Sequence, residues 1–305
     1  MKIRIGFSYL PSPRGGVQAG PFYEMVDALE GLDFDSLWLS DRVAGEGLDP
    51  HLGLAAAAAR TRRIKLGTSV TVLPGRNPYR LAKELVSLDH LSGGRALPIF
   101  GLGRFDPAER EALGVAAGAR APWLEEGVPL LRRLWSEPEV THPGPRFPAS
   151  GFRLRPRPTR PRLDIWLGGA SPPELERCGR LGDGWLASFL TPEEAAARKG
   201  IVEAAAAAAG REVDPDHFGV IIPYSLRPLA PPDLEQYEAR RAELRLGPGI
   251  ADLVPQSAER LRAQIEDFTA RGFSKFVLRP SVPPDSWATE LGEVAGIVLP
   301  LQSAA

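Results

Sequence analysis

The sequence has 305 residues, a formal net charge of −1, and 43% hydrophobic and 25% charged residues, which is ordinary for a globular chain. This balance excludes the basic surface that nucleic-acid binding needs, and the single cysteine, Cys178, excludes an internal disulfide and a cysteine zinc site. No apolar run approaches the roughly 20 residues that span a bilayer, and the first residues, "MKIRIGFSYLP", lack a signal-peptide core. We therefore expect a soluble, cytoplasmic protein that binds neither nucleic acid nor a membrane.

Short apolar runs recur along the chain and are expected to form eight strands. They are continuous apolar segments without polar alternation, which indicates parallel strands buried on both faces. The expected strands are residues 3–7, 36–39, 65–72, 96–100, 163–167, 184–187, 218–222 and 275–278.

Longer amphipathic segments lie between these runs and are expected to be helices. Residues 51–63 and 202–212 are rich in alanine, the residue with the highest helix propensity. The stretches 171–174 and 191–194 both match a capping box with proline at the first helical position. The other expected helices are residues 21–32, 80–94 and 257–273.

The alternation of eight strands with helices predicts an α/β fold, a (β/α)8 TIM barrel, as a single domain over residues 1–305. Residues 137–162, rich in proline and arginine, are expected to be an insertion of short strands before strand 5. Residues 223–256 are polar and contain several prolines, and we expect a long, mobile loop after strand 7. A doubly wound open sheet is the main alternative, but it fits eight regularly spaced units less well.

In such barrels the active site lies at the carboxyl ends of the strands. These ends carry no lysine for a Schiff base and no clear pair of carboxylates for glycoside hydrolysis. The four histidines are scattered, so we expect no metal site, and the lone Gly101-x-Gly103 is a weak dinucleotide motif. The small, hydroxyl-bearing and aromatic residues that remain favour a large planar cofactor, which would supply the chemistry that the side chains lack.

The residues that we expect to contact this cofactor stand at or just after strand ends. They are Ser8, Ser40, Thr68, Ser69, Val70, Gly101, Gly103 and Arg279. For Arg279, at the end of strand 8, a structural ion pair is an equally open interpretation.

Several stretches of the chain carry a family resemblance. They are "SLWLSDR" (36–42), "RIKLGTSVTVLPGRNPYRLAKELVSLDHLSGGR" (63–95), "FGLGRFDPAEREALGV" (100–115), "LLRRLWSE" (130–137) and "DIWLGGASPPELERCGRLGDGWL" (164–186). Together they resemble the bacterial luciferase-like monooxygenase superfamily, and more narrowly its branch of oxidoreductases that depend on the deazaflavin coenzyme F420. The resemblance implies a (β/α)8 fold with a flavin-type ring across the barrel mouth. It also implies a non-prolyl cis peptide bond between Ser69 and Val70.

The resemblance further assigns the cofactor phosphate to a turn formed by Gly168, Gly169, Ala170 and Ser171. Backbone N–H groups at a helix start attract anions. However, Pro172 and Pro173 remove two of these donors and Glu174 repels anions, although Arg177, one turn further on, could compensate. A plain strand-to-helix turn is the alternative.

Two charged residues, Arg42 and Arg104, differ from the family pattern, and a third, Asp41, precedes Arg42. Arg42 replaces the histidine with which the second strand ends in family members that oxidise alcohols or sugars, and Arg104 replaces a glutamate of the sugar-oxidising members. Arginine cannot deliver a proton at neutral pH but can hold an anionic substrate. Asp41 would need a pKa about 3 units higher to act as an acid, and pairing with Arg42 would lower it. We therefore expect all three to orient the substrate, or Asp41 and Arg42 to be a salt-linked pair that stabilises the loop.

The function expected on this basis is an F420-dependent oxidoreductase that transfers a hydride between the deazaflavin and a small organic substrate. An FMN-dependent monooxygenase, supplied with reduced flavin by a separate reductase, is the first alternative. A non-catalytic cofactor-binding protein is the second, because the family's histidine and glutamate are missing. By family analogy the protein is expected to be a homodimer. The sequence identifies neither the substrate nor the proton donor.

Overall fold

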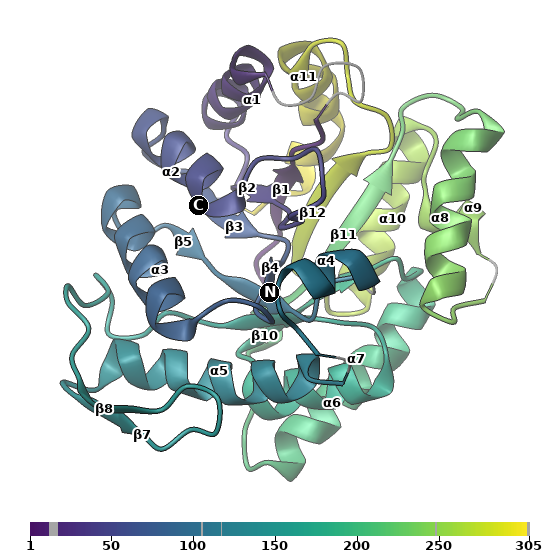
Figure 1. Cartoon of the computed structure of the whole chain (residues 1–305). Helices are drawn as coiled ribbons and strands as arrows, with labels where there is room; N and C mark the ends of the chain where they lie inside the picture. Colours follow the sequence, from purple (N-terminus) through teal and green to yellow (C-terminus); the bar gives the residue numbers. More distant parts are fainter. Residues whose placement is uncertain (12–17, 105, 117, 248, 304–305) are drawn as a thin grey trace.

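Within the described residues, ten strands form one curled sheet whose neighbouring strands all run parallel (Figure 1). This computed structural model describes residues 1–11, 18–104, 106–116, 118–247 and 249–303. The strands are β1 (Arg4–Ser8), β2 (Ser36–Leu39), β3 (Lys65–Thr68), β4 (Thr71–Val72), β5 (Ala96–Leu97), β6 (Ile99–Gly101), β9 (Trp166–Gly168), β10 (Gly184–Ser188), β11 (Phe218–Tyr224) and β12 (Lys275–Pro280). Their order in the sheet is β4-β6-β9-β10-β11-β12-β1-β2-β3-β5.

Each of the eight strands expected from the sequence is present, and two of them are divided in two. The segment 65–72 is interrupted at Ser69 and Val70, whose peptide bond is cis as the resemblance implies. The segment 96–101 is interrupted at Pro98, which has no N–H group for a ladder hydrogen bond. β3 pairs with β5 and β4 pairs with β6, so the two divided segments stay side by side on both sides of their breaks.

Helices surround the strands in Figure 1. They are α1 (Ala19–Gly31), α2 (Pro50–Arg60), α3 (Pro78–Ser92), α5 (Arg120–Ser136), α6 (Pro172–Leu181), α7 (Pro192–Ala208), α10 (Ala258–Ala270) and α11 (Trp287–Val298). Side-chain oxygens of Asp49, Asn77 and Thr191 accept hydrogen bonds from the first turns of α2, α3 and α7. No helix in the described part of the chain combines the length and the apolar character that crossing a membrane requires.

The prediction of a long loop over residues 223–256 is wrong, because this segment contains α8 (Pro231–Glu243) and α9 (Ile250–Leu253). The buried residues of α8 are Tyr237 and Arg241, which lie one turn apart. Arg241 pairs with Glu194 of α7 at 2.9 Å. One of the two buried residues of α8 is therefore charged, and a search for apolar periodicity could not detect this helix.

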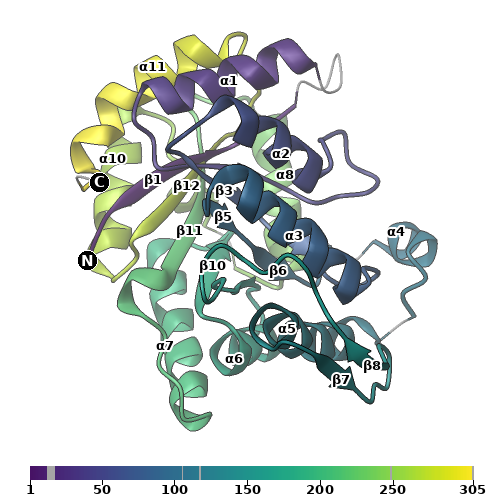
Figure 2. The same cartoon turned by 90° about the vertical axis from the view of Figure 1, so that its left-hand side faces the viewer.

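Residues 137–162 contain two short strands, as expected. β7 (Val140–His142) and β8 (Ala149–Phe152) pair with each other in antiparallel orientation and lie beside α5 in Figure 2. The same view shows α4 (Pro107–Ala112) on the side of the molecule away from the N-terminus. This is the side toward which the strands run.

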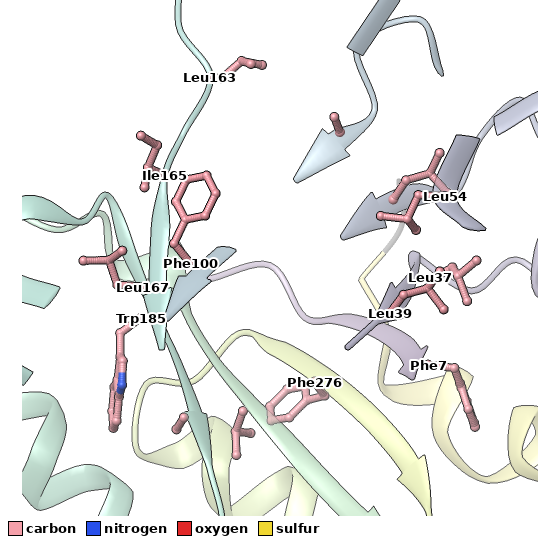
Figure 3. Close-up of a cluster of buried hydrophobic side chains, with 14 of the residues drawn as sticks. Phe7, Leu37, Leu39, Leu54, Phe100, Leu163, Ile165, Leu167, Trp185 and Phe276 are labelled. Atoms are coloured by element: carbon pink, nitrogen blue, oxygen red, sulfur yellow. The ribbon is translucent and has the colours of Figure 1, made fainter. Parts of the chain in front are cut away.

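The side chains of the sheet alternate between two apolar clusters. The larger cluster joins the strands to the helices, and Figure 3 shows Phe7, Leu37 and Phe276 among its members. The smaller cluster lies on the opposite, concave face, because its buried members are all strand residues. We call it the inner layer; its buried members are Trp38, Ile99, Trp166, Leu186 and Val277.

Candidate functional site

A cavity of about 520 Å³ lies at the carboxyl ends of the strands, with residues of α4 and α8 in its wall. Because parallel strands end at one edge of a sheet, residues that are distant in the sequence meet there. Most of the residues predicted to bind cofactor or substrate line this cavity. They are Ser40, Asp41, Arg42, Ser69, Val70, Gly101, Gly103, Arg104, Gly168, Gly169, Ala170 and Arg279.

The floor of the cavity is built around Val70. A Cβ atom on Gly101 would lie 2.6 Å from Val70 Cγ2, and a Cβ on Gly168 would lie 2.9 Å from Val70 Cγ1. These positions must therefore be glycine if Val70 is to keep its place. Leu186 and Ile221 extend the apolar surface. Hydroxyl groups adjoin it, since Ser40 Oγ donates to the carbonyl of Ser69 at 3.2 Å.

This floor fits the planar cofactor that the resemblance implies. An apolar surface with neighbouring hydroxyls can take one face of an unsaturated ring system, while the hydroxyls bind its polar edge. The residues that would hold the ring are Ser40, Ser69, Val70, Gly101 and Gly168.

Four of the predicted site residues lie outside the cavity wall. Ser8 is buried at the end of β1. Thr68 is also buried; its hydroxyl donates to the Ile99 carbonyl at 3.0 Å and accepts the Ile99 N–H at 3.1 Å. Thr68 thus replaces the ladder bonds that are lost at Pro98. Arg177 faces α5 and pairs with Glu125 at 2.9 Å, so it does not compensate for Glu174.

Ser171, the fourth, belongs to the turn predicted to hold a phosphate, and the donors of Ala170 and Ser171 in this turn are already used. The Glu174 carboxylate accepts hydrogen bonds from the Ala170 N–H at 3.1 Å, the Ser171 N–H at 3.0 Å and the Ser171 hydroxyl at 2.8 Å. An anion could use these donors only by displacing Glu174. The structure thus favours the alternative of a capped strand-to-helix turn, and the Ser-Pro-Pro-Glu pattern was the sequence signal for it.

Asp41 pairs with Arg76, and the predicted pairing with Arg42 is wrong. Its Oδ2 atom accepts hydrogen bonds from the Val72 N–H at 2.9 Å and from Arg76 Nε and Nη2 at 3.2 and 3.0 Å. The Asp41 side chain is 5% exposed. It therefore ties the end of β2 to the β4 turn, and an oxygen with three donors is poorly placed to act as an acid.

The wall of the cavity carries arginine side chains that differ in their partners. Arg104 pairs with Glu243 of α8 at 3.3 Å, and Glu243 also binds Arg240 at 2.6 Å. The guanidinium groups of Arg42 and Arg279 have no hydrogen-bond or ion-pair partner among the described residues. Burial lowers the pKa of Arg279, and repulsion from Arg42 and Arg104 adds to this effect. The cavity thus has a positive side with spare donors.

Sequence reasoning missed the contribution of α8. Tyr237 lines the cavity, and its hydroxyl donates to Ser281 Oγ at 3.0 Å. Its ring lies 6.4 Å from that of Phe189, a wall residue with a φ of 59° that non-glycine residues seldom adopt. Arg240 lies 5.7 Å from the centre of the Phe189 ring. Pro231 was the sequence signal that could have indicated the start of α8, because proline is favoured in the first turn of a helix.

Comparison with known proteins agrees with this architecture. The F420-dependent glucose-6-phosphate dehydrogenase of Intrasporangium calvum is 34% identical over 188 residues, which are 55% of this chain and 54% of that protein. A solved F420-dependent secondary alcohol dehydrogenase, in complex with an F420–acetone adduct, is 21% identical with a TM-score of 0.80, over 99% of this chain and 100% of that one.

A third similar protein is the oxygenating constituent of 3,6-diketocamphane monooxygenase from Pseudomonas putida, a type II Baeyer–Villiger monooxygenase solved with FMN. It is 17% identical with a TM-score of 0.79 over the whole of both chains. The relatives are thus oxidoreductases and monooxygenases. The model of the luciferase-like monooxygenase family matches residues 4–275. The chain belongs to this family.

Proposed function

We propose that this protein is an oxidoreductase that transfers a hydride between F420 and a small organic substrate. The observation that carries the proposal is the cavity floor, where Val70 occupies the space left open by Gly101 and Gly168. This surface suits the ring of a deazaflavin. The 34% identity to an F420-dependent dehydrogenase supports the choice of F420, and FMN stays the alternative because limonene 1,2-monooxygenase of Rhodococcus erythropolis is also 34% identical.

We infer that the ten strands count as the eight strands of a closed (β/α)8 barrel. β3 and β4 are halves of one expected strand, and β5 and β6 are halves of the next. β4 and β5 stand at the two ends of the sheet order. The other half of β4, which is β3, pairs with β5, and the other half of β5, which is β6, pairs with β4. Closure of the sheet explains why the floor residues of β6 and β9 face the same space as Ser40.

Bound F420 would supply the hydride chemistry. The residues of the chain bind and orient the reactants: the Val70 floor fixes the ring, and the side chains of α4 and α8 shield the sides of the cavity from water. Asp41 keeps the β4 turn in place through Arg76. Arg42 and Arg279 hold a negative charge on the substrate, or one that develops on its reacting oxygen.

We therefore propose that the substrate is an organic acid or another small anion. A neutral alcohol would leave both guanidinium groups without a partner beside it, and this is unfavourable for Arg279, which is partly buried. An anionic substrate would satisfy their donors with charge-assisted hydrogen bonds. A homodimer, and a separate reductase that regenerates the reduced cofactor, stay predictions.

Fluorescence quenching of the purified protein by F420 and by FMN tests the cofactor, and turnover with reduced F420 on matched acidic and neutral substrates tests the reaction. We expect F420 to bind and the acidic substrates to react. Tight FMN binding without F420 binding would support the FMN-dependent monooxygenase instead. Binding of either cofactor without turnover on a broad panel would support a non-catalytic binding protein.

A further inference from the structure

A second cavity lies at the opposite end of the sheet, where the strands begin. It measures about 230 Å³, and its wall includes the first residues of β1, β3 and β12, which are Arg4, Lys65 and Lys275. The inner layer separates it from the first cavity, since Trp38 and Trp166 line the second cavity and Leu186 lines the first. The two spaces are therefore distinct sites.

The described wall of this second cavity is strongly basic. Its arginines and lysines are Arg4, Arg63, Lys65, Arg95, Arg160 and Lys275, its histidine is His217, and its acidic residue is Asp164. Asp35, close by, binds Lys275 at 2.7 Å and lies 3.6 Å from Lys65. Even with these partners counted, positive charge exceeds negative charge around the space.

Two of the arginines serve the fold and have little capacity left for a ligand. Arg95 donates to five neutral oxygen atoms, among them the carbonyls of Ser92 and Ile64 at 2.6 Å. Arg63 donates to the carbonyl of Phe34 at 3.0 Å and pairs with Asp33 at 3.0 Å. These side chains hold the loops that precede the strands.

Arg4 and Arg160 differ, because each keeps a buried donor without a partner. The Nε atoms of both are buried and make no hydrogen bond. Arg4 otherwise binds the Asp216 carbonyl and Ser274 Oγ through Nη2. Arg160 binds the Ala96 carbonyl at 3.0 Å, and its closest carboxylate, on Asp89, is 3.8 Å away. The Arg160 side chain is 37% exposed, so an anion can reach its guanidinium group.

The basic groups also affect one another. Burial lowers the pKa of Lys275 to about 8, and the charges of Lys65 and Arg4 act in the same direction although Asp35 opposes them. Lys275 Nζ lies 5.5 Å from the centre of the Trp38 ring, which forms part of the apolar wall. An anion in this space would relieve the mutual repulsion of three cations.

We propose that this second cavity binds a small phosphate-type oxyanion, either inorganic phosphate or a small phosphate monoester. Guanidinium and ammonium groups that converge from several strands match an oxyanion with several acceptor atoms. One water occupies about 30 Å³ of liquid, so the cavity has room for a phosphate group and a small organic portion. The proposal is independent of the proposed function, because it concerns the other end of the sheet.

Isothermal titration of the full chain with inorganic phosphate and with glycerol phosphate, at ionic strength held constant with potassium chloride, tests the site. We expect saturable binding that Arg160→Gln weakens about tenfold, because one charge-assisted contact is lost. Asp164→Asn should tighten binding about fivefold by removing a repulsive charge. Arg262→Gln, which removes an exposed arginine of α10, is the matched control and should bind like the wild type.

The results test whether the site exists and identify which type of anion it binds. Stronger binding of glycerol phosphate would identify a monoester, and equal or weaker binding would identify the free ion. The proposal is overturned if no saturable binding exceeds that of chloride, or if the variants at positions 160 and 164 bind like the control. It is also overturned if Arg279→Gln abolishes the binding, since this would place the anion in the first cavity. Circular dichroism of each variant establishes that it is folded.

Discussion

The two ends of the curled sheet are formed by the same strands but have opposite chemistry. At the carboxyl end, Gly101 and Val70 help to form an apolar floor with hydroxyls beside it. At the amino end, Lys65 and Lys275 begin their strands with buried or half-buried charge. Residues in the middle of the strands belong to the apolar clusters, whereas residues near the strand ends can be polar or charged. The comparison teaches that the chemical character of each end of the sheet is set within a few residues of the strand ends.

The largest effect is expected from Gly101→Val at the carboxyl end. Its side chain would overlap Val70, because a Cβ on Gly101 already lies 2.6 Å from Val70 Cγ2. Displacement of Val70 into the cavity should weaken F420 binding about 100-fold, the equivalent of an overpacking cost of 2–3 kcal/mol. Fluorescence quenching measures it. Gly296→Ala on α11, where a Cβ would meet no atom within 4 Å, is the control. Unchanged F420 affinity in Gly101→Val would contradict the floor.

A pH effect of about 2 kcal/mol is expected from the amino end. Burial alone would raise the pKa of Asp35, but Lys275 and Lys65 outweigh it and lower this pKa to about 2. Since the unfolded chain has a pKa near 3.9, the stabilisation is complete above about pH 4 and is lost as the pH falls toward 2.

Urea unfolding between pH 5 and pH 2 measures this contribution. Asp35→Asn should lose less stability over the interval than the wild type does. Asp27→Asn, which removes an exposed partner of Arg60, should lose as much as the wild type. Equal losses for all three proteins would show that the Asp35 pair does not govern this part of the pH profile.

A smaller effect, about tenfold in KM, is expected from Arg279→Gln. The variant removes a cation that no described residue neutralises, so KM for an acidic substrate should rise, and KM for a neutral analogue should not. The free energy of unfolding should stay constant or rise, because an unpaired, partly buried charge is removed. Steady-state kinetics against the Arg262→Gln control checks this. Equal KM changes for both substrates would reject an anion site.

The smallest effect is expected from Glu174→Gln in the strand-to-helix turn. Its amide can still accept the turn's hydrogen bonds, so the loss of stability should be about 1 kcal/mol or less, as for other helix caps. F420 affinity should not fall, because the N–H groups of Ala170 and Ser171 are already used within the protein. A clear fall would show that the turn holds the cofactor. Thermal unfolding and fluorescence quenching measure the two effects.

The strands and most of the cavity wall could be predicted from the sequence because they depend on local patterns. Continuous apolar runs identified the strands, and the rule that strand ends meet at one edge brought Ser40, Gly101 and Gly168 together. Capping boxes at Ser171 and Thr191 were equally local signals, and both are present.

The remainder depended on contacts between distant segments. Asp41 is bound by Arg76, which only the fold brings near it, whereas Arg42 is its neighbour in sequence. Thr68 is used by the fold because Pro98 interrupts the adjacent strand, and no pattern around Thr68 reveals this. The helix that carries Tyr237 was missed because its buried face includes a paired arginine. The periodicity of apolar residues does not show which polar residues pair when they are distant in the sequence.

The inner layer has a consequence for protein engineering. Its five buried apolar side chains separate the first cavity from the second. Moving an ion through this apolar layer would cost several kcal/mol or more. The two halves of the sheet are therefore modular. A chimaeric protein could take the first residues of its strands from one parent and the last residues from another, provided that both parents have the same five inner-layer side chains.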